Sequence, residues 1–482
     1  MCDIILYGLS VCAILFVFFV IYSNFRVLPP SIRIPIAGQR FPKGFLWATG
    51  EDAYQHEGGN LNNDWARWEA QSPSPIDNGD RCGRAVDFYN RYMHDFKMAA
   101  ADHQNAHRIG IEWSRVEPRI GEYDDKAWRR YEDMLRTMKK HGFVSFFNIW
   151  HFTLPLWAVE LGGWESDEVT ARWESFVREC AKRLGRYIDY WSTMIDAQIY
   201  ALAGYGTGEI PPNVKDMKRA IAVYGRLIHA HAKAYHIIKE HASSDAKGVK
   251  RIPKIGMIYF FFDFAPKGIF IDKIIMRQLE RIFNWKLLDA VHTGRIDISV
   301  LLGPSLKKED KELKGTLDWI GVNYYTREIV SFNPLKPGMV SRTVYKKYPA
   351  SDMGWEIYPE GLYHICGEIV KRYPGVPIMI AENGIADSKD DRRPQFILDH
   401  LAWVHRMIQE GMPVFGYTYW SLTDNWEWAK GFWPKFGLYR VNRDTLERIE
   451  TVSARLFRFI AGNNRLPDAS ECEKFISGKR II

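Results

Sequence analysis

Short apolar runs alternate with longer amphipathic segments along most of this chain, and this alternation constrains the fold more than any other feature. Short apolar runs predict buried strands, whereas longer segments with a helical period predict helices. We expect eight strands, at residues 44–49, 106–111, 144–150, 190–195, 254–260, 319–323, 377–381 and 414–420. We expect eight helices between and after them, at residues 86–101, 126–141, 171–187, 217–240, 271–291, 359–372, 395–410 and 452–461.

Eight strands that each lead to a helix predict an α/β fold with one closed (β/α)8 TIM barrel. The length of 482 residues would also fit several domains, but such barrels often hold this length as one unit with insertions. Hydrophobic and charged fractions of 46% and 26% exclude a disordered chain and a polytopic membrane protein. We therefore predict a barrel domain at residues 41–465 and a C-terminal tail at residues 466–482.

The N-terminal segment departs from this pattern, because residues 4–22 form an uncharged apolar run. As a helix, the run is about long enough to cross the ~30 Å hydrocarbon core of a bilayer. A cleaved signal peptide is the alternative, but it usually has a basic start and small residues at its cleavage site. We predict one transmembrane helix at residues 1–23 as an uncleaved anchor, and an extended proline-rich linker at residues 24–40.

Positive charge beside this segment predicts its orientation. Arg26, Arg33, Arg40 and Lys43 follow the apolar run, and no Lys or Arg precedes it. Positively charged flanks tend to stay on the cytoplasmic side of a membrane. We therefore expect a single-pass membrane protein whose barrel faces the cytoplasm.

Charge and cysteine content narrow the range of partners. The net charge of +7 could favour nucleic acid or anionic lipid, but Lys and Arg are dispersed and no basic stripe alternates with aromatic residues. We therefore expect no nucleic-acid partner. The 6 cysteines are widely spaced without a CxxC pair, so the sequence predicts neither a zinc site nor a disulfide framework. The sequence does not specify an oligomeric state.

Polar and aromatic residues stand at the carboxyl ends of the predicted strands, where a barrel places its active-site groups. These residues are Arg108 in the second strand, His151 after the third, Asp196 after the fourth, Asn323 and Tyr325 at the end of the sixth, Glu382 after the seventh and Trp420 at the end of the eighth. One such residue would more often be an ordinary rim group, but so many together predict a shared pocket. Aromatic faces beside charged and amide groups are the combination that a sugar needs.

Nine segments of the chain carry a more specific signal. In chain order they read FPKGFLWATG, AYQHEGG, NNDW, HRIGIEWSRVEP, HFTLPLW, WIGVNYYTR, SDMGWEIYPEGLY, IMIAENGIAD and YWSLTDNWEWAKGFWPKFGL. Over about residues 41–460 the chain resembles glycoside hydrolase family 1, the β-glucosidases and related β-glycosidases, and its pattern is closest to archaeal and bacterial members. The resemblance implies a barrel enzyme that hydrolyses β-linked glycosides with retention of configuration and requires no metal or organic cofactor.

The resemblance also implies roles for individual residues. Retaining enzymes use two carboxyl groups about 5 to 5.5 Å apart, one as nucleophile and one as acid and base. Glu382, in the segment AENG, matches the nucleophile, and Arg108 and Tyr325 match the groups that keep it ionised and oriented. The other matches bind sugar: Gln55, His151, Glu427 and Trp428 at the hydroxyls, Trp420 beneath the ring, and Asn323 in a supporting position.

One strand end departs from the family pattern. The fourth strand of the family normally ends in Asn-Glu-Pro, in which Glu is the acid/base and Asn binds the sugar 2-hydroxyl, but here it ends in Ile195-Asp196-Ala197. The shorter side chain withdraws the carboxyl group by roughly 1 to 1.5 Å if the backbone is unchanged, a displacement that can cost about a hundredfold in rate. Ile195 cannot donate the hydrogen bond to the 2-hydroxyl. The sequence therefore predicts an impaired or specialised acid/base step at Asp196.

Three functions remain open at this point. The first is a retaining β-glycosidase of the β-glucosidase or β-galactosidase type, with Asp196 as a weakened acid/base. The second is a membrane-associated transglycosylating enzyme that acts on glycolipids, and the third is a catalytically weak sugar-binding homologue. Residues 324–349 are predicted to form loops over the pocket, where the choice of aglycone lies.

Overall fold

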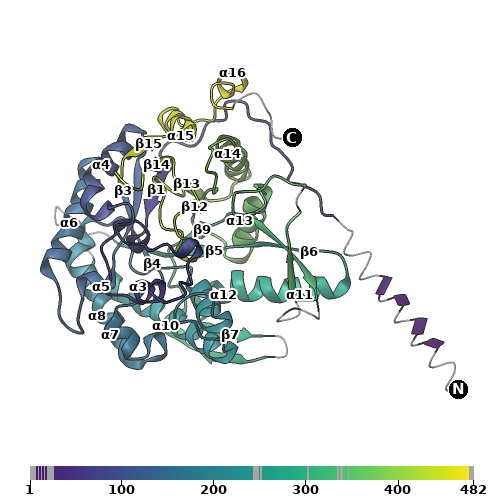
Figure 1. The fold of residues 1–482 in the computed structure, drawn as a ribbon, viewed down its shortest axis with the longest axis horizontal. Coiled ribbons are helices and arrows are strands. Elements are labelled where there is room, and N and C mark those ends of the chain that lie inside the picture. The colour runs from purple at the N-terminus through teal and green to yellow at the C-terminus, as the bar shows by residue number, and fades with distance from the viewer. Residues whose placement is uncertain are drawn as a thin grey trace.

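Eight parallel strands close into a barrel at the centre of the domain, with helices around it (Figure 1). The computed structural model describes residues 7–8, 10–11, 14–15, 17–18, 27–242, 249, 252–300, 303–333, 336, 340–345 and 347–476. The barrel strands are β1 (Leu46–Glu51), β2 (Ala106–Gly110), β3 (Val144–Asn148), β4 (Tyr190–Ile195), β5 (Lys254–Phe260), β9 (Trp319–Asn323), β12 (Ile378–Asn383) and β13 (Val414–Tyr419). Each agrees with a predicted strand to within two residues at either end, so the predicted barrel is confirmed.

Helices surround this barrel at the predicted places. They are α4 (Phe88–Ala101), α6 (Asp125–Lys140), α8 (Asp167–Leu184), α10 (Met217–His241), α11 (Phe270–Glu280), α12 (Lys286–Thr293), α13 (Glu360–Arg372), α14 (Arg393–Gln409) and α15 (Val452–Asn463). Several begin at a side chain that accepts hydrogen bonds from free backbone amides, such as Asp124 before α6 and Ser166 before α8. The single helix predicted at residues 271–291 is instead divided, because a π-helical turn (η5, Arg281–Trp285) separates α11 from α12.

Shorter elements occupy the loops between strands and helices. The helical ones are α2 (Ala53–Glu57), α3 (Asp64–Glu69), η1 (Asp77–Gly79), α5 (Trp113–Val116), α7 (Leu156–Glu160), η2 (Gly163–Glu165), η3 (Gly185–Tyr187), α9 (Ala197–Ile199), η4 (Tyr200–Thr207), η6 (Lys311–Leu313), η8 (Trp428–Lys430) and α16 (Ala469–Cys472). Two antiparallel pairs are β7 (Arg295–Ser299) with β8 (Ser305–Glu309), and β14 (Tyr439–Val441) with β15 (Arg448–Glu450).

The region predicted as loops at residues 324–349 contains regular structure. Its strands β10 (Arg327–Phe332) and β11 (Val340–Thr343) pair with each other, and β10 also pairs with β6 (Asp263–Pro266). The loop prediction is therefore corrected for the described part of this region. Pairing with β6, which is distant in sequence, supplies the backbone partners that the local pattern did not indicate.

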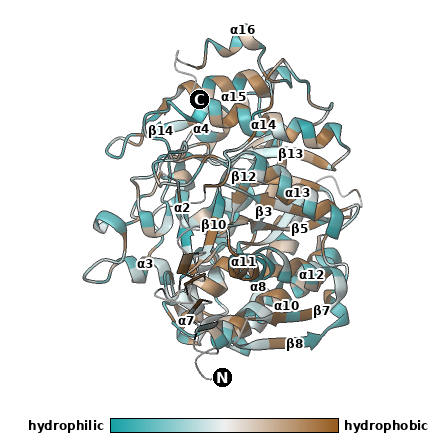
Figure 2. Cartoon of the chain, turned by 90° about the vertical axis from the view of Figure 1, so that its right-hand side faces the viewer, coloured by the Kyte–Doolittle hydropathy of each residue, from teal (hydrophilic) through white to brown (hydrophobic). Residues whose placement is uncertain are grey.

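Two apolar layers hold the barrel together. Inside it, Ala48, Ala106 and Phe146 pack against Trp319 and Met379. Outside it, apolar faces of the helices cover the strands, and in Figure 2 helices such as α13 and α14 carry both hydrophobic and hydrophilic turns. Side chains two residues apart on a strand share a face, so Arg108, Asn148 and Asn323 continue the inward-facing rows toward the carboxyl ends of their strands.

The predicted membrane anchor is corrected. Among the described residues, no helix has the length and apolar character needed to cross a membrane, which requires about 20 consecutive apolar residues. The single-pass anchor at residues 1–23 and the cytoplasm-facing membrane location inferred from it are therefore not supported. Apart from residues 7–8, 10–11, 14–15 and 17–18, the apolar run predicted at residues 4–22 lies outside the described residues.

Residues 27–39, within the predicted linker, lie against the barrel domain. They contain no helix or strand. The Ile32 amide donates to Glu360 Oε2 at 3.1 Å, the Glu360 amide donates to Ser31 Oγ at 3.1 Å, and the Gly38 amide donates to the Pro467 carbonyl at 3.3 Å. These bonds attach the segment to the start of α13 and to the C-terminal region.

Candidate active site

Glu382, the predicted nucleophile, stands near the carboxyl end of β12 and is 5% exposed. Its Oε1 accepts a hydrogen bond from Arg108 Nη2 at 2.7 Å, and its Oε2 accepts one from the Tyr325 hydroxyl at 2.7 Å. Both predicted neighbours therefore contact Glu382 directly. In the described part of the chain each oxygen has one donor, and the two bonds fix the rotation of the carboxylate group.

The residues after Glu382 allow the backbone to turn here. A Cβ atom on Gly384 would lie 2.0 Å from the Trp420 carbonyl oxygen, so only glycine permits this approach of the two strand ends. The Trp420 amide donates to the Asn383 carbonyl at 3.1 Å. The Asn-Gly pair of the AENG segment thus joins the end of β12 to the end of β13.

A buried carboxylate behind Glu382 anchors Arg108. Arg108 Nη2 also donates to Asp52 Oδ2 at 2.9 Å, and His151 Nδ1 lies 3.1 Å from the same oxygen. Burial opposes the charged form of Asp52, but Arg108 and His151 outweigh it and lower the pKa of Asp52 to about 2. Asp52 is therefore an anion at neutral pH that holds two of the predicted site residues in place.

Opposing forces act on the charge of Glu382. Burial raises its pKa above the usual value and Asp52 adds repulsion, whereas Arg108, His151 and the Tyr325 hydroxyl favour the carboxylate. The Tyr325 pKa is raised well above 10 by burial and by Glu382, so its hydroxyl keeps the proton that it donates. The net effect is a raised pKa, because burial outweighs Arg108, His151 and the Tyr325 hydroxyl, which each favour the carboxylate.

Asp196, the predicted acid/base, follows β4 and is 7% exposed. Its backbone is left-handed, with φ 52° and ψ 40°, and the pairing of β4 with β5 is irregular between Ser192 and Ile195. Aspartate tolerates the left-handed region better than most residues do. An irregular pairing next to a strand end can redirect a side chain, so the direction of the Asp196 carboxyl group could not be derived from a regular strand.

The surroundings of Asp196 favour its protonated form. Burial raises the pKa of Asp196 well above the usual value, and the charge of Glu382 raises it further. Asn323 Nδ2 contacts both carboxyl oxygens, at 3.3 and 3.4 Å. Asn323 is also paired in register with Glu382 on the neighbouring strand. Asn323 thus contacts the Asp196 carboxyl group through its side chain and adjoins Glu382 through the register of its strand.

Ile195 does not contribute to this polar cluster. Its side chain is fully buried inside the barrel, in the same apolar cluster as Ala48 and Phe146. That this position lacks a donor for a sugar hydroxyl stays a prediction. Asn323 Oδ1 and Asn148 Oδ1 are buried polar atoms of the same barrel face that have no hydrogen-bond partner among the described residues.

The predicted sugar ligand Gln55 is hydrogen-bonded to Trp426, the residue before the predicted ligand Glu427. Gln55 Nε2 donates to the Trp426 carbonyl at 2.9 Å, and the Trp426 amide donates to the Gln55 carbonyl at 3.1 Å. Gln55 Oε1 and Glu427 Oε2 are buried without a hydrogen-bond partner in the described part of the chain. Burial and the charge of Glu382 raise the pKa of Glu427 to about 8. Buried polar atoms are normally satisfied, so these two are suited to bind the hydroxyls of a ligand.

Aromatic rings complete the site. Trp420 is 3% exposed, and the Arg108 guanidinium lies 5.1 Å from its ring centroid. Trp428 packs against His151 at 4.9 Å and against Phe152 at 5.0 Å between ring centroids. Every predicted site residue therefore belongs to the carboxyl-terminal end of the barrel or to a loop that follows one of its strands.

Sequence reasoning missed other residues of the site. Asp52 could have been found, because it is a charged residue directly after the first strand. Phe260 stacks on Tyr325 with centroids 5.5 Å apart, and Trp355 packs against the same ring at 5.5 Å. Phe260 has no sequence signal beyond that of an apolar residue in a predicted strand. Trp355 lies in a loop, and the sequence does not indicate where that loop packs.

The barrel and the carboxyl groups at its carboxyl-terminal end define a glycoside hydrolase of the (β/α)8 class. The sequence model of glycosyl hydrolase family 1 matches residues 37–466, and the chain belongs to this family. It is therefore a glycoside hydrolase, as the resemblance predicted.

Individual relatives agree with this assignment. A beta-galactosidase from Pyrococcus woesei is 32% identical over 88% of this chain and 97% of its own length. Beta-glucosidase A from Thermotoga maritima is 30% identical over 89% of this chain and 99% of its own length. The solved family 1 β-glucosidase from Thermotoga maritima superposes with a TM-score of 0.81 at 28% identity, over 89% of this chain and 100% of that one.

Proposed function

We propose that this chain is a retaining β-glycosidase that cleaves β-glucosides or β-galactosides by a double displacement with Glu382 as nucleophile. The observation that carries the proposal is the contrast between two neighbouring carboxyl groups. Arg108 and Tyr325 stabilise the anion of Glu382, whereas burial and that anion favour the protonated form of Asp196. Retaining hydrolysis needs this pairing of a nucleophile and an acid.

In the first step, Glu382 attacks the anomeric carbon and forms a glycosyl ester as the bond to the aglycone oxygen breaks. Asp196 gives its proton to that oxygen, so the aglycone leaves as a neutral alcohol. In the second step, the Asp196 carboxylate takes a proton from water, whose oxygen attacks the anomeric carbon and releases Glu382. Asn323, in contact with both oxygens of Asp196, positions the group that moves the proton in each step.

In this reaction the proton transfers by Asp196 are the slow steps. Asp196 is one methylene shorter than the family residue, and proton transfer falls steeply when donor and acceptor are farther apart. Ile195 also leaves its position without a polar contact to the sugar. We therefore propose that aglycones that leave without full protonation are the better substrates.

The sugar-binding side favours neutral hydroxyl groups. Gln55 Oε1 and Glu427 Oε2 can both accept hydrogen bonds from sugar hydroxyls. The charge of Glu382 lies near Glu427 and raises its pKa, so this corner of the site is electronegative. A phosphorylated sugar would be repelled there, which supports simple glucosides or galactosides, the substrates in the names of two relatives.

A second candidate is transglycosylation, in which an alcohol replaces water in the second step. Phe260 and Trp355 are half-buried, flank Tyr325, and continue into the apolar cluster of Phe262 and Phe264. Such a surface would favour an apolar acceptor or aglycone over a polar one. The third possibility, a protein that binds sugar without turnover, is retained as an outcome of the test.

The test uses the full chain with activated aryl β-glucosides and β-galactosides. We expect release of the aryl alcohol and free sugar, whereas a new glycoside on an added alcohol would support transglycosylation. Glu382→Gln should abolish turnover while sugar binding persists, because the covalent intermediate can no longer form. Undiminished turnover in Glu382→Gln would refute the nucleophile.

Azide tests Asp196 separately. Azide attacks the glycosyl ester without giving up a proton, so it bypasses the base in the second step and forms a glycosyl azide. We expect azide to accelerate turnover of activated substrates by the natural chain and by Asp196→Ala. An unchanged rate in Asp196→Ala without azide would show that Asp196 has no role in either step.

A further inference from the structure

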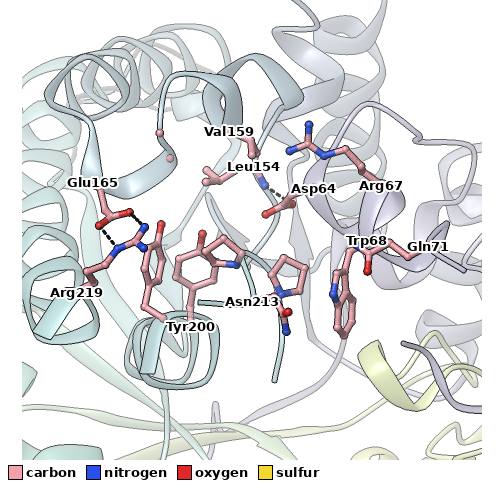
Figure 3. A pocket seen from close by; sticks show the side chains of 15 residues that line it. Asp64, Arg67, Trp68, Gln71, Leu154, Val159, Glu165, Tyr200, Asn213 and Arg219 are labelled. Carbon is pink, nitrogen blue, oxygen red and sulfur yellow. Dashed lines mark hydrogen bonds and ion pairs between the residues drawn. The ribbon is translucent and has the colours of Figure 1, made fainter. Parts of the chain in front are cut away.

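A second cavity opens on the same end of the barrel, outside the cluster around Glu382. Its volume is about 380 Å³, which lies within the range of small-molecule sites. It is formed by α3, the loop and helix α7 after β3, and η4 with the segment that follows it (Figure 3). The lining contains none of the predicted active-site residues.

The floor of this cavity is buried and its rim is exposed. Trp68, Tyr200 and Tyr205 line the floor and are 7%, 1% and 2% exposed, so Trp68 offers the largest accessible part of the three rings. Gln71 and Asn213 are exposed at its rim and carry amide groups. The cavity therefore combines an aromatic floor with hydrogen-bonding groups at its rim and is open to solvent.

Asp64 supplies a mostly buried carboxyl group to the cavity lining. The side chain is 6% exposed, and its Oδ1 accepts hydrogen bonds from the amides of Trp65 at 3.0 Å and Leu154 at 2.9 Å. No described residue donates a hydrogen bond to its Oδ2, although Asp64 lines the cavity and points toward it in Figure 3. A carboxyl oxygen at a cavity wall that no described residue contacts is suited to accept a hydrogen bond from a hydroxyl group.

The charges around the cavity are balanced. Arg219 forms two hydrogen bonds with Glu165, at 2.8 and 2.6 Å, so each neutralises the other. Arg67 lies close enough to Asp64 to lower its pKa, against the larger effect of burial, which raises that pKa to about 7. Two acidic and two basic groups leave no excess of either sign, which favours a neutral polar ligand over an ion.

A single layer of rings separates this cavity from the active site. Phe152 lies 6.2 Å from Tyr200 on the cavity side and 5.0 Å from Trp428 on the active-site side, measured between ring centroids. Trp65 lies in the same way between Trp68 at 5.3 Å and Trp428 at 4.6 Å. A ligand in the cavity would therefore press on the rings that support Trp428.

We propose that this cavity is a second binding site for a neutral saccharide, in which the accessible part of Trp68 contacts the apolar side of the sugar and Asp64 Oδ2 accepts a hydrogen bond from a hydroxyl group. The site is independent of the reaction proposed above, because no residue of that reaction lines it. The shared layer of Phe152 and Trp65 connects occupation of the cavity to the position of Trp428.

The test compares glucose binding to the full chain and to variants of each site, measured by calorimetry and by tryptophan fluorescence. Val159→Phe adds a ring to a half-buried position of the cavity lining. Leu161→Phe adds a similar ring to an exposed residue two positions along, which does not line the cavity, and serves as the matched control. Glu427→Ala removes a sugar ligand from the active site instead.

We expect two classes of site in the natural chain and in Leu161→Phe. Val159→Phe should lose one class, with a loss of affinity on the order of tenfold or more, and Glu427→Ala should lose the other. Gln71→Ala, at the exposed rim, should weaken the cavity site several-fold without affecting the fold.

The two proposals fail in different ways. The second site would be overturned if the natural chain showed a single class of glucose site that disappears in Glu427→Ala and is unchanged in Val159→Phe and Gln71→Ala. That result would leave the proposed active site supported. Binding that persists in Glu427→Ala and disappears in Val159→Phe would support the second site even if no glycoside were hydrolysed.

Discussion

At the scale of single residues, the site depends on two acidic side chains in unlike surroundings. Glu382 contacts a guanidinium and a phenol, whereas among the described residues the Asp196 carboxyl group has one side-chain donor, the weaker amide of Asn323. An acid and a nucleophile can work at the same pH only when their surroundings separate their pKa values in this way. Asp52, with its low pKa, contributes by holding Arg108 against Glu382.

The first prediction concerns the pH dependence of kcat/KM for an aryl β-glycoside. Activity requires ionised Glu382 and protonated Asp196, so kcat/KM should rise with pH as Glu382 loses its proton and fall as Asp196 loses its own. Burial raises the pKa values of both groups. Both the rising and the falling part of the pH profile should therefore lie at higher pH than for two solvent-exposed carboxyl groups. Asp196→Asn should remove the descending limb; a descending limb of unchanged position in this variant would contradict the assignment.

The second prediction restores the family residue. Asp196→Glu lengthens the side chain and should raise kcat for glycosides with poor leaving groups by about tenfold or more, because the proton donor gains reach. Glycosides with good leaving groups should change by less than about threefold, since they need little protonation. Steady-state kinetics on a series of aryl glycosides measures both effects. The left-handed backbone at position 196 suits Glu less well, and a kcat below that of Asp196→Asn would contradict the prediction.

At the scale of elements, the segment around β10 positions the aromatic side of the site. Arg327, at the start of β10, forms two hydrogen bonds of 2.9 Å with Glu356, and the two residues are 6% and 4% exposed. Thr326 also donates to the Glu356 carbonyl at 2.9 Å. These bonds fix the residue next to Trp355, whose ring packs against Tyr325.

The third prediction removes one partner of this ion pair. Arg327→Met leaves the Glu356 carboxylate buried and unpaired, which should lower the free energy of unfolding by about 3 to 5 kcal/mol. Denaturant unfolding measures the loss, and KM for aryl glycosides should rise because Trp355 is no longer held. The double variant Arg327→Met with Glu356→Met is the control and should recover part of the stability. A double variant less stable than the single one would contradict this account.

At the scale of the whole molecule, several buried acids make stability depend on pH. Burial raises the pKa values of Glu57, Asp64 and Glu69 to about 7 and that of Glu112 to about 8. Above pH 4.5 these groups hold more protons in the folded chain than in the unfolded chain, so stability falls as pH rises through 7 and 8. Burial lowers the pKa values of three histidines, His56, His231 and His400. Their contribution to stability rises with pH, but only below about pH 6.5, where the unfolded chain binds the proton.

The fourth prediction follows from these signs. Thermal unfolding, followed by circular dichroism, should show a midpoint that falls by a few degrees, ~2 to 5 °C, between pH 6.5 and pH 8.5. Glu112→Gln should reduce this fall, because its amide oxygen can still accept the hydrogen bond of 2.6 Å from Thr153 without a charge. A midpoint that rises over this interval would contradict the assignment of these acids.

The amino-acid sequence by itself determined the barrel, and it predicted residues that the structure brings to one end of that barrel. Its eight strands differ from the observed ones by at most two residues at each end, because a parallel strand buried on both faces is a continuous apolar run. Glu382, Arg108, Tyr325 and Gln55 were predicted from local segments, and strand ends in a barrel meet at one face. Local sequence patterns were sufficient to predict features that depend on one strand and the residues directly after it.

Only the tertiary structure decided how these groups act on one another. The pairing of Arg108 with Asp52, the raised pKa of Asp196 and the register of Asn323 with Glu382 all join residues from strands that are distant in sequence. The same holds for the sheet of β6, β10 and β11, and for the cavity behind Phe152. A residue type indicates which charge or hydrogen bond is available, but burial and distance decide its strength, and both arise only when the chain has closed into the barrel.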